Sequence, residues 1–212
     1  MSNLTNKMKK ILTSLLVLFS LTVNSQVIDW DNFDSEIADK VLLVEMNKFR
    51  DSLGLSTFVY SQSLHDNLST YTTDQMVKER KTHHPNKNHL LEKTNREMKK
   101  ELIGKLNLKL AEWKIKLFGP YEVCVAAFVQ LHGEGGLRYH SKTYNQLAKN
   151  LIKHWCTSKP HYKTLTDPFG DMSSGQKTLF SVGSASIQLG KCGYSGYDKI
   201  YATFQMYKVY EY

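Results

Sequence analysis

The side chains of this chain that are best suited to nucleophilic or metal chemistry are its cysteines and histidines. Three cysteines, Cys124, Cys156 and Cys192, permit at most one disulfide, in any of three pairings, with one thiol left over. The sequence contains no Cys-x-x-Cys, His-Glu-x-x-His or zinc-finger spacing. His154 lies close to Cys156 on a predicted helix, but such near neighbours do not face each other as a nucleophile and its base must. Segment 170–175 lacks the spacing of a serine nucleophile elbow, so the sequence does not support a serine hydrolase.

The elements that must position these side chains are predicted from apolar periodicity. Apolar residues recur with helical spacing in segments 35–51, 61–81 and 143–155. Segments 180–189 and 199–209 predict two antiparallel strands joined by a glycine-rich turn. The remaining segments are a basic helix over 87–101, a helix or strand over 106–117, a buried run over 122–129 and a short helix over 161–165. Helices followed by a terminal pair of strands indicate an α+β fold.

The N-terminus has the pattern of a secretory signal peptide. Three lysines, Lys7, Lys9 and Lys10, precede an apolar run over 11–23, and small or polar residues follow it. An apolar run of this length is too short to span the ~30 Å hydrocarbon core of a bilayer. We expect cleavage near Ser25 and Gln26, which leaves residues 26–212 as a single domain, secreted to the extracellular space or the periplasm.

The positive charge of the chain is concentrated in one segment. The formal net charge is +8, and the predicted signal peptide contributes three lysines and no acid. Nine Lys or Arg stand against four Glu between Lys87 and Lys116, so the rest of the mature chain is close to neutral. A nucleic-acid-binding surface spread over the fold is therefore not favoured. The segment 86–118 is interpreted as a basic insertion, whose charged face is either simply solvated or contacts an anionic surface of the cell envelope.

Several groups of residues, in order between Val41 and Tyr207, resemble the motifs of one family. They are Asn47-x-x-Arg50 with Gly54-Leu55, then Phe58-x-Tyr60-Ser61-x-x-Leu64, Thr82-His83-His84-Pro85, Trp155-x-x-Ser158-x-x-His161, Val182-Gly183 and Tyr201–Tyr207. Together they resemble bacterial members of the CAP superfamily, the group of cysteine-rich secretory proteins, antigen 5 and pathogenesis-related proteins. The resemblance implies an α-β-α sandwich with a small antiparallel sheet. We interpret Asn47 and Arg50 as structural residues that tie the first helix to a loop.

The resemblance also implies an open cleft that holds two histidines and one or two acids. His161 matches the second histidine, and either His83 or His84 matches the first, with His84 slightly favoured. For the glutamate, Glu122 is preferred to Glu134, because a carboxylate beside an apolar strand needs a partner. Some relatives bind a divalent metal here, so His84 and His161 are candidate ligands for Zn.

The site departs from the family pattern, and alternatives remain open. The glycine and asparagine expected around Glu122 are missing, and 143–155 contains no acid. Glu122 alternatively pairs with a lysine such as Lys116 on the surface. We expect a monomeric extracellular protein that binds a lipid, peptide or envelope component. The alternative is a protease-like hydrolase that uses His84, Glu122 and His161, with or without Zn.

Overall fold

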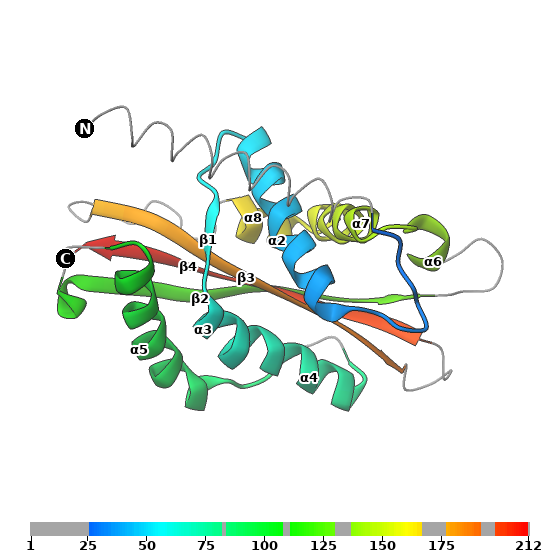
Figure 1. Ribbon diagram of the computed structural model, residues 1–212, viewed down its shortest axis with the longest axis horizontal. Coiled ribbons are helices and arrows are strands. Elements are labelled where there is room, and N and C mark those ends of the chain that lie inside the picture. The colour runs from blue at the N-terminus through cyan, green and yellow to red at the C-terminus, as the bar shows by residue number, and fades with distance from the viewer. Residues whose placement is uncertain are drawn as a thin grey trace.

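A four-stranded mixed sheet forms the centre of the computed structural model, which describes residues 26–81, 84–107, 111–129, 137–166, 177–191 and 198–211 (Figure 1). Its strands are β1 (Phe58–Tyr60), β2 (Ile115–Phe128), β3 (Lys177–Lys191) and β4 (Asp198–Glu211), in the order β1-β3-β4-β2. The predicted antiparallel pairing of the last two strands is confirmed. The predicted signal peptide, residues 1–25, lies outside the described residues.

Two strands of this sheet were not predicted as strands. β2 contains residues 122–128 of the predicted buried run and begins earlier, at Ile115, where it pairs with β4. This pairing decides the ambiguous segment 106–117, of which 108–110 lie outside the described residues. The helix before it ends at Lys105, a short 3-10 helix, η2, covers Glu112–Lys114, and the strand begins at Ile115. The three-residue β1 pairs in parallel with β3, so the sheet is mixed, and the predicted antiparallel pairing applies to β2, β3 and β4 but not to β1.

Helices lie on both faces of the sheet (Figure 1). On one side are α2 (Ser35–Ser52), α6 (Leu137–His140), α7 (Tyr144–Thr157) and α8 (Lys159–Thr166). On the other are α3 (Gln62–Leu64), the π-helical turn η1 (His65–Ser69), α4 (Thr70–Glu79) and α5 (Asn88–Lys105). The structure thus confirms a mixed α and β fold. Among the described helices, none is both long and apolar enough to cross a bilayer.

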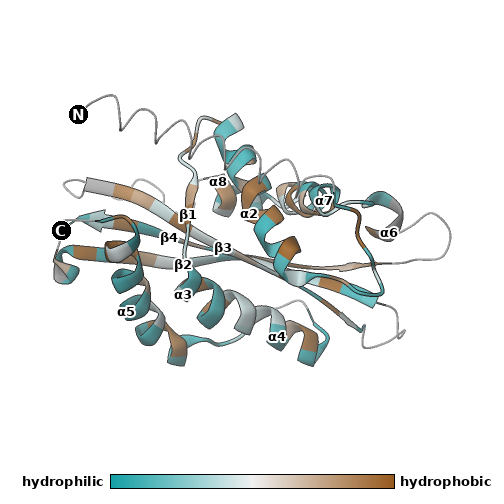
Figure 2. Cartoon of the chain, viewed as in Figure 1, coloured by the Kyte–Doolittle hydropathy of each residue, from teal (hydrophilic) through white to brown (hydrophobic). Residues whose placement is uncertain are grey.

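Strand β4 divides its side chains between two cores, because successive residues of a strand point to opposite faces. Ala202 and Phe204 pack with α2 and α7 in the first core. Tyr207 and Val209 pack with α3, η1 and α5 in the second. Hydrophobic and hydrophilic residues are also interspersed along α2 and α5, as in helices that bury one side against a sheet (Figure 2). This alternation also decides which polar residues of the sheet face the α4–α5 side, where the candidate site lies.

Asn47 and Arg50 anchor α2 to the segments beside it. The Asn47 amide donates to the carbonyl of Phe58 (3.0 Å) and accepts from the Phe58 N–H (2.8 Å), which fixes the start of β1. The Arg50 guanidinium donates to the carbonyls of Ser56 (2.8 Å) and Leu165 (2.6 Å). The predicted structural role of both residues is confirmed.

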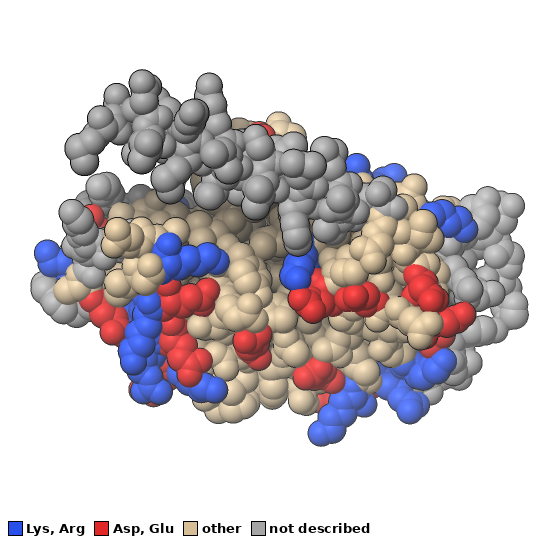
Figure 3. Space-filling view, viewed as in Figure 1, with Lys and Arg blue, Asp and Glu red and all other residues tan. Residues whose placement is uncertain are grey.

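Helix α5, the main part of the predicted basic insertion, is built into the second core. Its Met98 and Leu102 are fully buried. Its Glu101 faces inward and accepts hydrogen bonds from the backbone N–H groups of Gln62 and Ser63, at the start of α3. The exposed basic residues of the helix include Lys93, Arg96 and Lys100, and Figure 3 shows basic side chains gathered along it. Contact of this face with an anionic surface stays a prediction.

Candidate functional site

Glu122 is the centre of a buried polar cluster on the α4–α5 side of the sheet. It lies on β2 opposite Gln205 of β4, and only 7% of its side chain is exposed. One carboxylate oxygen, Oε1, faces the hydroxyls of Thr72 (3.1 Å) and Thr203 (3.4 Å) and the amide of Gln205 (3.0 Å). A buried carboxylate needs such donors, because it has given up its water shell.

The other oxygen of Glu122, Oε2, contacts two groups that come from the segment after α4. His84 approaches it with Nδ1 at 2.7 Å, and the Lys87 ammonium lies at 2.5 Å. The two partners differ in exposure, since 55% of the His84 side chain but only 11% of the Lys87 side chain is accessible. Lys87 is therefore an internal counter-ion, whereas His84 stands at the surface of the site.

The protonation state of Glu122 follows from these contacts. Burial on its own raises the pKa of this carboxyl, but the hydrogen bond from His84 and the charge and hydrogen bond of Lys87 outweigh it and lower the pKa to about 2. Glu122 is therefore a carboxylate at any physiological pH. A group with so low a pKa is a weak general base near neutrality.

His161 approaches the site from α8, a helix that contacts β2. Burial lowers the pKa of His161, and the charges of His84 and His154 lower it further. Within the described residues, no hydrogen bond joins His161 to His84 or Glu122. The structure thus brings Glu122 and His84 into direct contact, and it packs the helix that carries His161 against β2.

The alternates His83 and Glu134 lie outside the described residues, so the preference for His84 and Glu122 over them stays a prediction. The structure does decide the partner of Glu122. It is the buried Lys87 and not Lys116, which is exposed at the start of β2. Cys124 and Cys156 are both free thiols, so no disulfide joins them.

One group of side chains has the donor types of a metal site. Ligand atoms of His84, Glu122 and Cys124 all lie within 4.8 Å of one another. Two features oppose a metal there. Lys87 already occupies Oε2 of the carboxylate. In addition, burial and then the charge of Glu122 raise the pKa of the Cys124 thiol to about 12, which disfavours the thiolate that binds metal. The residues fit Zn only if the ammonium of Lys87 moves away.

Sequence reasoning missed Lys87, Thr72, Gln205 and Cys124 as parts of this cluster. Lys87 was assigned to the basic segment, although it is buried. A usable signal was present in segment 201–207, where Thr203 and Gln205 alternate with apolar residues on a strand that is buried on both faces. Buried polar residues at alternate positions of such a strand indicate a polar cluster.

Comparison with known proteins found no match to any family model, curated protein or solved structure.

Proposed function

We propose that this chain is a secreted, CAP-like binding protein whose ligand, a lipid, a peptide or an envelope component, contacts His84 and His161. Three things support the family. The motifs lie in the family's order, and helices cover both faces of a central sheet as in an α-β-α sandwich. His84 contacts Glu122 on β2, and α8, which carries His161, packs against β2. The proposed role is recognition without a chemical step.

The observation that carries this proposal is that both carboxylate oxygens of Glu122 already have hydrogen-bond donors. Its two oxygens face donors from five side chains, those of Thr72, His84, Lys87, Thr203 and Gln205. The carboxylate therefore serves to hold His84 through Nδ1, which leaves Nε2 as the nitrogen available to a ligand. A carboxylate fixed in this way orients an imidazole and does not have to accept a proton from water.

A binding experiment with defined probes tests the proposal. We expect vesicles of phosphatidylglycerol or a pool of casein peptides to shift the imidazole NMR signals of His84 and His161 without cleavage of any peptide. His84→Ala abolishes the shift of His161, whereas His89→Ala, an exposed histidine on α5, leaves it unchanged. Probes that move neither signal contradict the binding proposal. Peptide cleavage that depends on His84, read by mass spectrometry, establishes the hydrolase instead.

The hydrolase remains the second candidate, because of the donor set formed by His84, Glu122 and Cys124. Zn bound by His84 and His161, or by this set, would activate water. For Zn to reach Oε2 of Glu122, the ammonium of Lys87 has to leave it. Lys87 therefore separates the two candidates.

Zinc binding is predicted to appear only when Lys87 is removed. We expect Zn to leave the melting temperature of the tag-free wild-type protein unchanged. In Lys87→Met, where Oε2 of Glu122 is freed, we expect Zn to raise it by about 5–10 °C, as saturation of a ligand site gives in a domain of this size. Each protein is compared with itself plus and minus Zn, so the lower stability of the variant does not matter. A wild-type rise that His84→Ala and His161→Ala both remove would instead support a zinc site in the native cleft.

A further inference from the structure

A groove with a volume of about 540 Å³ lies between α2 and α7, which pack against each other. The residues that line this α2–α7 groove are spaced three or four positions apart on each helix. Side chains with this spacing lie on one face of a helix, so the lining consists of the two helix faces that meet. They are Glu45, Lys48 and Phe49 on α2, and Lys149, Ile152, Lys153 and Cys156 on α7. None of them belongs to the cluster around Glu122.

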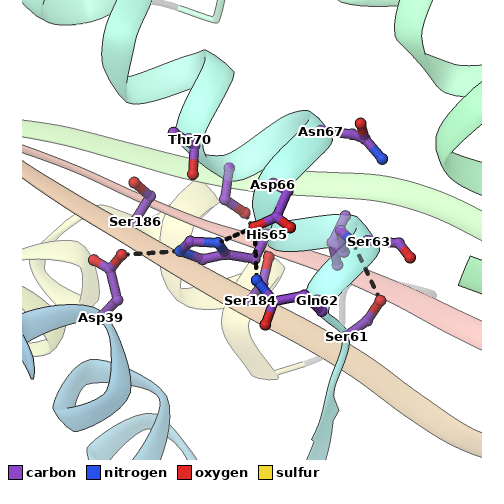
Figure 4. A network of polar contacts seen from close by, with 12 residues as sticks. Asp39, Ser61, Gln62, Ser63, His65, Asp66, Asn67, Thr70, Ser184 and Ser186 are labelled. Atoms are coloured by element: carbon purple, nitrogen blue, oxygen red, sulfur yellow. Dashed lines mark hydrogen bonds and ion pairs between the residues drawn. The ribbon is translucent and has the colours of Figure 1, made fainter. Parts of the chain in front are cut away.

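Contacts away from the groove fix α2 in place. The side chain of Asp39 accepts a backbone N–H of β3 and lies 3.0 Å from Nε2 of His65, in the π-helical turn η1. The other ring nitrogen of His65, Nδ1, lies 2.8 Å from Oδ1 of Asp66 (Figure 4). Farther along α2, Arg50 donates to the carbonyl of Leu165 in α8. Because these contacts hold α2 without any ligand, its wall of the groove is preformed, and little affinity is lost in ordering it.

The groove has an excess of positive charge. Between Leu137 and Thr166, a segment that contains α6, α7 and α8, the chain has six Lys or Arg and no Asp or Glu. Among the described residues of the lining, the one acid is Glu45 of α2, and it stands against three lysines. Asp51, the next acid along α2, is exposed and does not line the groove. One acid and three lysines give the lining a formal charge of +2, which favours an anionic ligand.

Glu45 holds two of these lysines at the groove and leaves each of them with free donors. Its side chain is only 3% exposed, with Oε1 at 2.5 Å from the Lys48 ammonium and Oε2 at 3.8 Å from the Lys149 ammonium. An ammonium has three N–H donors, so both lysines keep donors for a second acceptor. Lys153 is exposed and has no ion-pair partner within the described part of the chain. The groove therefore offers three ammonium groups to one anion.

The rest of the lining is apolar. Ile152 is buried, whereas Phe49 and Cys156 are partly buried. Burial raises the pKa of the Cys156 thiol, so this side chain is neutral near pH 7 and adds no negative charge. The ring of Phe49 and the sulfur of Cys156 both make favourable contacts with an aromatic ring. A groove of this volume that combines an apolar surface with a few charged groups is typical of a small-molecule site.

We propose that the α2–α7 groove binds a small organic anion, a carboxylate, sulfonate or phosphate group on a compact aromatic body. The anionic group contacts the ammonium groups of Lys48, Lys149 and Lys153, and the ring lies on the apolar part of the lining. This site shares no residue with the proposed recognition site at His84 and His161. Its test is therefore independent of the test of that site.

Calorimetric titration of the purified protein with sodium 2-naphthalenesulfonate at pH 7 tests the groove. We expect saturable binding that weakens as NaCl is added, because the charges of exposed lysines are screened by salt. Naphthalene-2-sulfonamide has nearly the same shape and no charge, so it should bind about tenfold more weakly or worse, since it lacks charge-assisted hydrogen bonds. Equal binding of the sulfonamide would overturn the proposal, as would the lack of saturable binding of the sulfonate.

Alkylation of Cys156 locates the bound ligand. Because Cys156 lines the groove, saturating 2-naphthalenesulfonate should slow its reaction with iodoacetamide. Peptide mass spectrometry measures this rate separately from any reaction of Cys124 and Cys192. An unchanged rate at Cys156 when the protein is saturated would show that the ligand binds elsewhere, and the proposal would fail.

Lysine variants test the proposed contacts. Lys149→Gln and Lys153→Gln, both at exposed side chains, should each weaken binding of the sulfonate, and the double variant should weaken it by about tenfold or more. Lys163→Gln is the matched control, because this exposed lysine lies in the same acid-free segment but does not line the groove. It should leave the affinity unchanged. An affinity that is unchanged in the double variant, or that Lys163→Gln lowers equally, would rule out a specific site in the groove.

Discussion

Glu122→Ala is expected to lower the free energy of unfolding by about 3–5 kcal/mol, because it leaves the buried ammonium of Lys87 without a counter-charge. The two groups are 2.5 Å apart and their side chains are 7% and 11% exposed. The change also removes the acceptor of the Thr72 hydroxyl and the Gln205 amide, which are fully buried. Urea unfolding at pH 7 measures the loss, and Glu92→Ala, at an exposed glutamate on α5, should stay within about 0.5 kcal/mol of wild type.

The pH dependence of this loss provides an internal check. The pKa of Glu122 in the folded protein is about 2, below its ordinary value of 4.5. Its stabilising contribution is therefore fully present above pH 4.5 and is lost as the pH falls toward 2. The difference between wild type and Glu122→Ala should therefore shrink on acidification. A difference that is small at pH 7, or that does not change between pH 7 and pH 3, would show that Glu122 is not the buried counter-ion of Lys87.

Arg50→Ala is expected to cost about 3–5 kcal/mol, since each hydrogen bond of a charged group contributes about 1.5–3 kcal/mol and two buried carbonyls lose their donor. The side chain is 4% exposed, and its guanidinium also lies over the ring of Phe58 at 4.3 Å. The loss should appear as a lower midpoint of urea unfolding. It tests whether the contact between α2 and Leu165, at the end of α8, holds the two helices together.

Two further variants define this effect. Arg50→Lys keeps the charge but cannot reach both the Ser56 and the Leu165 carbonyls with a planar fork, so it should recover less than half of the loss. Arg96→Ala, at an exposed arginine on α5, should change stability by no more than about 0.5 kcal/mol. Full recovery by lysine would show that charge alone, and not the pair of carbonyl contacts, accounts for the role of Arg50.

The elements whose patterns are local were predictable from the sequence. The helical period over 35–51 and 143–155 corresponds to α2 and α7, and Thr143 and Gln146 form the capping box that starts α7. The alternation in the last two strands corresponds to β3 and β4. In each case the signal comes from residues close together in the chain, where apolar spacing alone specifies the buried face.

The argument that a carboxylate beside an apolar strand needs a partner also held for Glu122, which is buried and fully hydrogen-bonded. The identity of the partner did not follow from the sequence. Lys87 lies 35 positions away and belongs to a segment whose other basic residues are mostly exposed. Charge counting cannot distinguish one lysine from its neighbours, because burial depends on how the segment after α4 folds back over β2.

The sequence by itself determined the class of fold, most of its helices, the terminal strand pair, the structural role of Asn47 and Arg50, and the need of Glu122 for a partner. Only the tertiary structure decided that β1 joins the sheet in parallel, that Lys87 is the counter-ion of Glu122, and that His65 lies between Asp39 and Asp66. The physical reason is the same in all three cases. A three-residue strand and an isolated charge leave no periodic pattern in the sequence, so partners from distant segments fix their positions. For β1 this happens through backbone pairing. For the charged side chains it happens because burying an unpaired charge is costly.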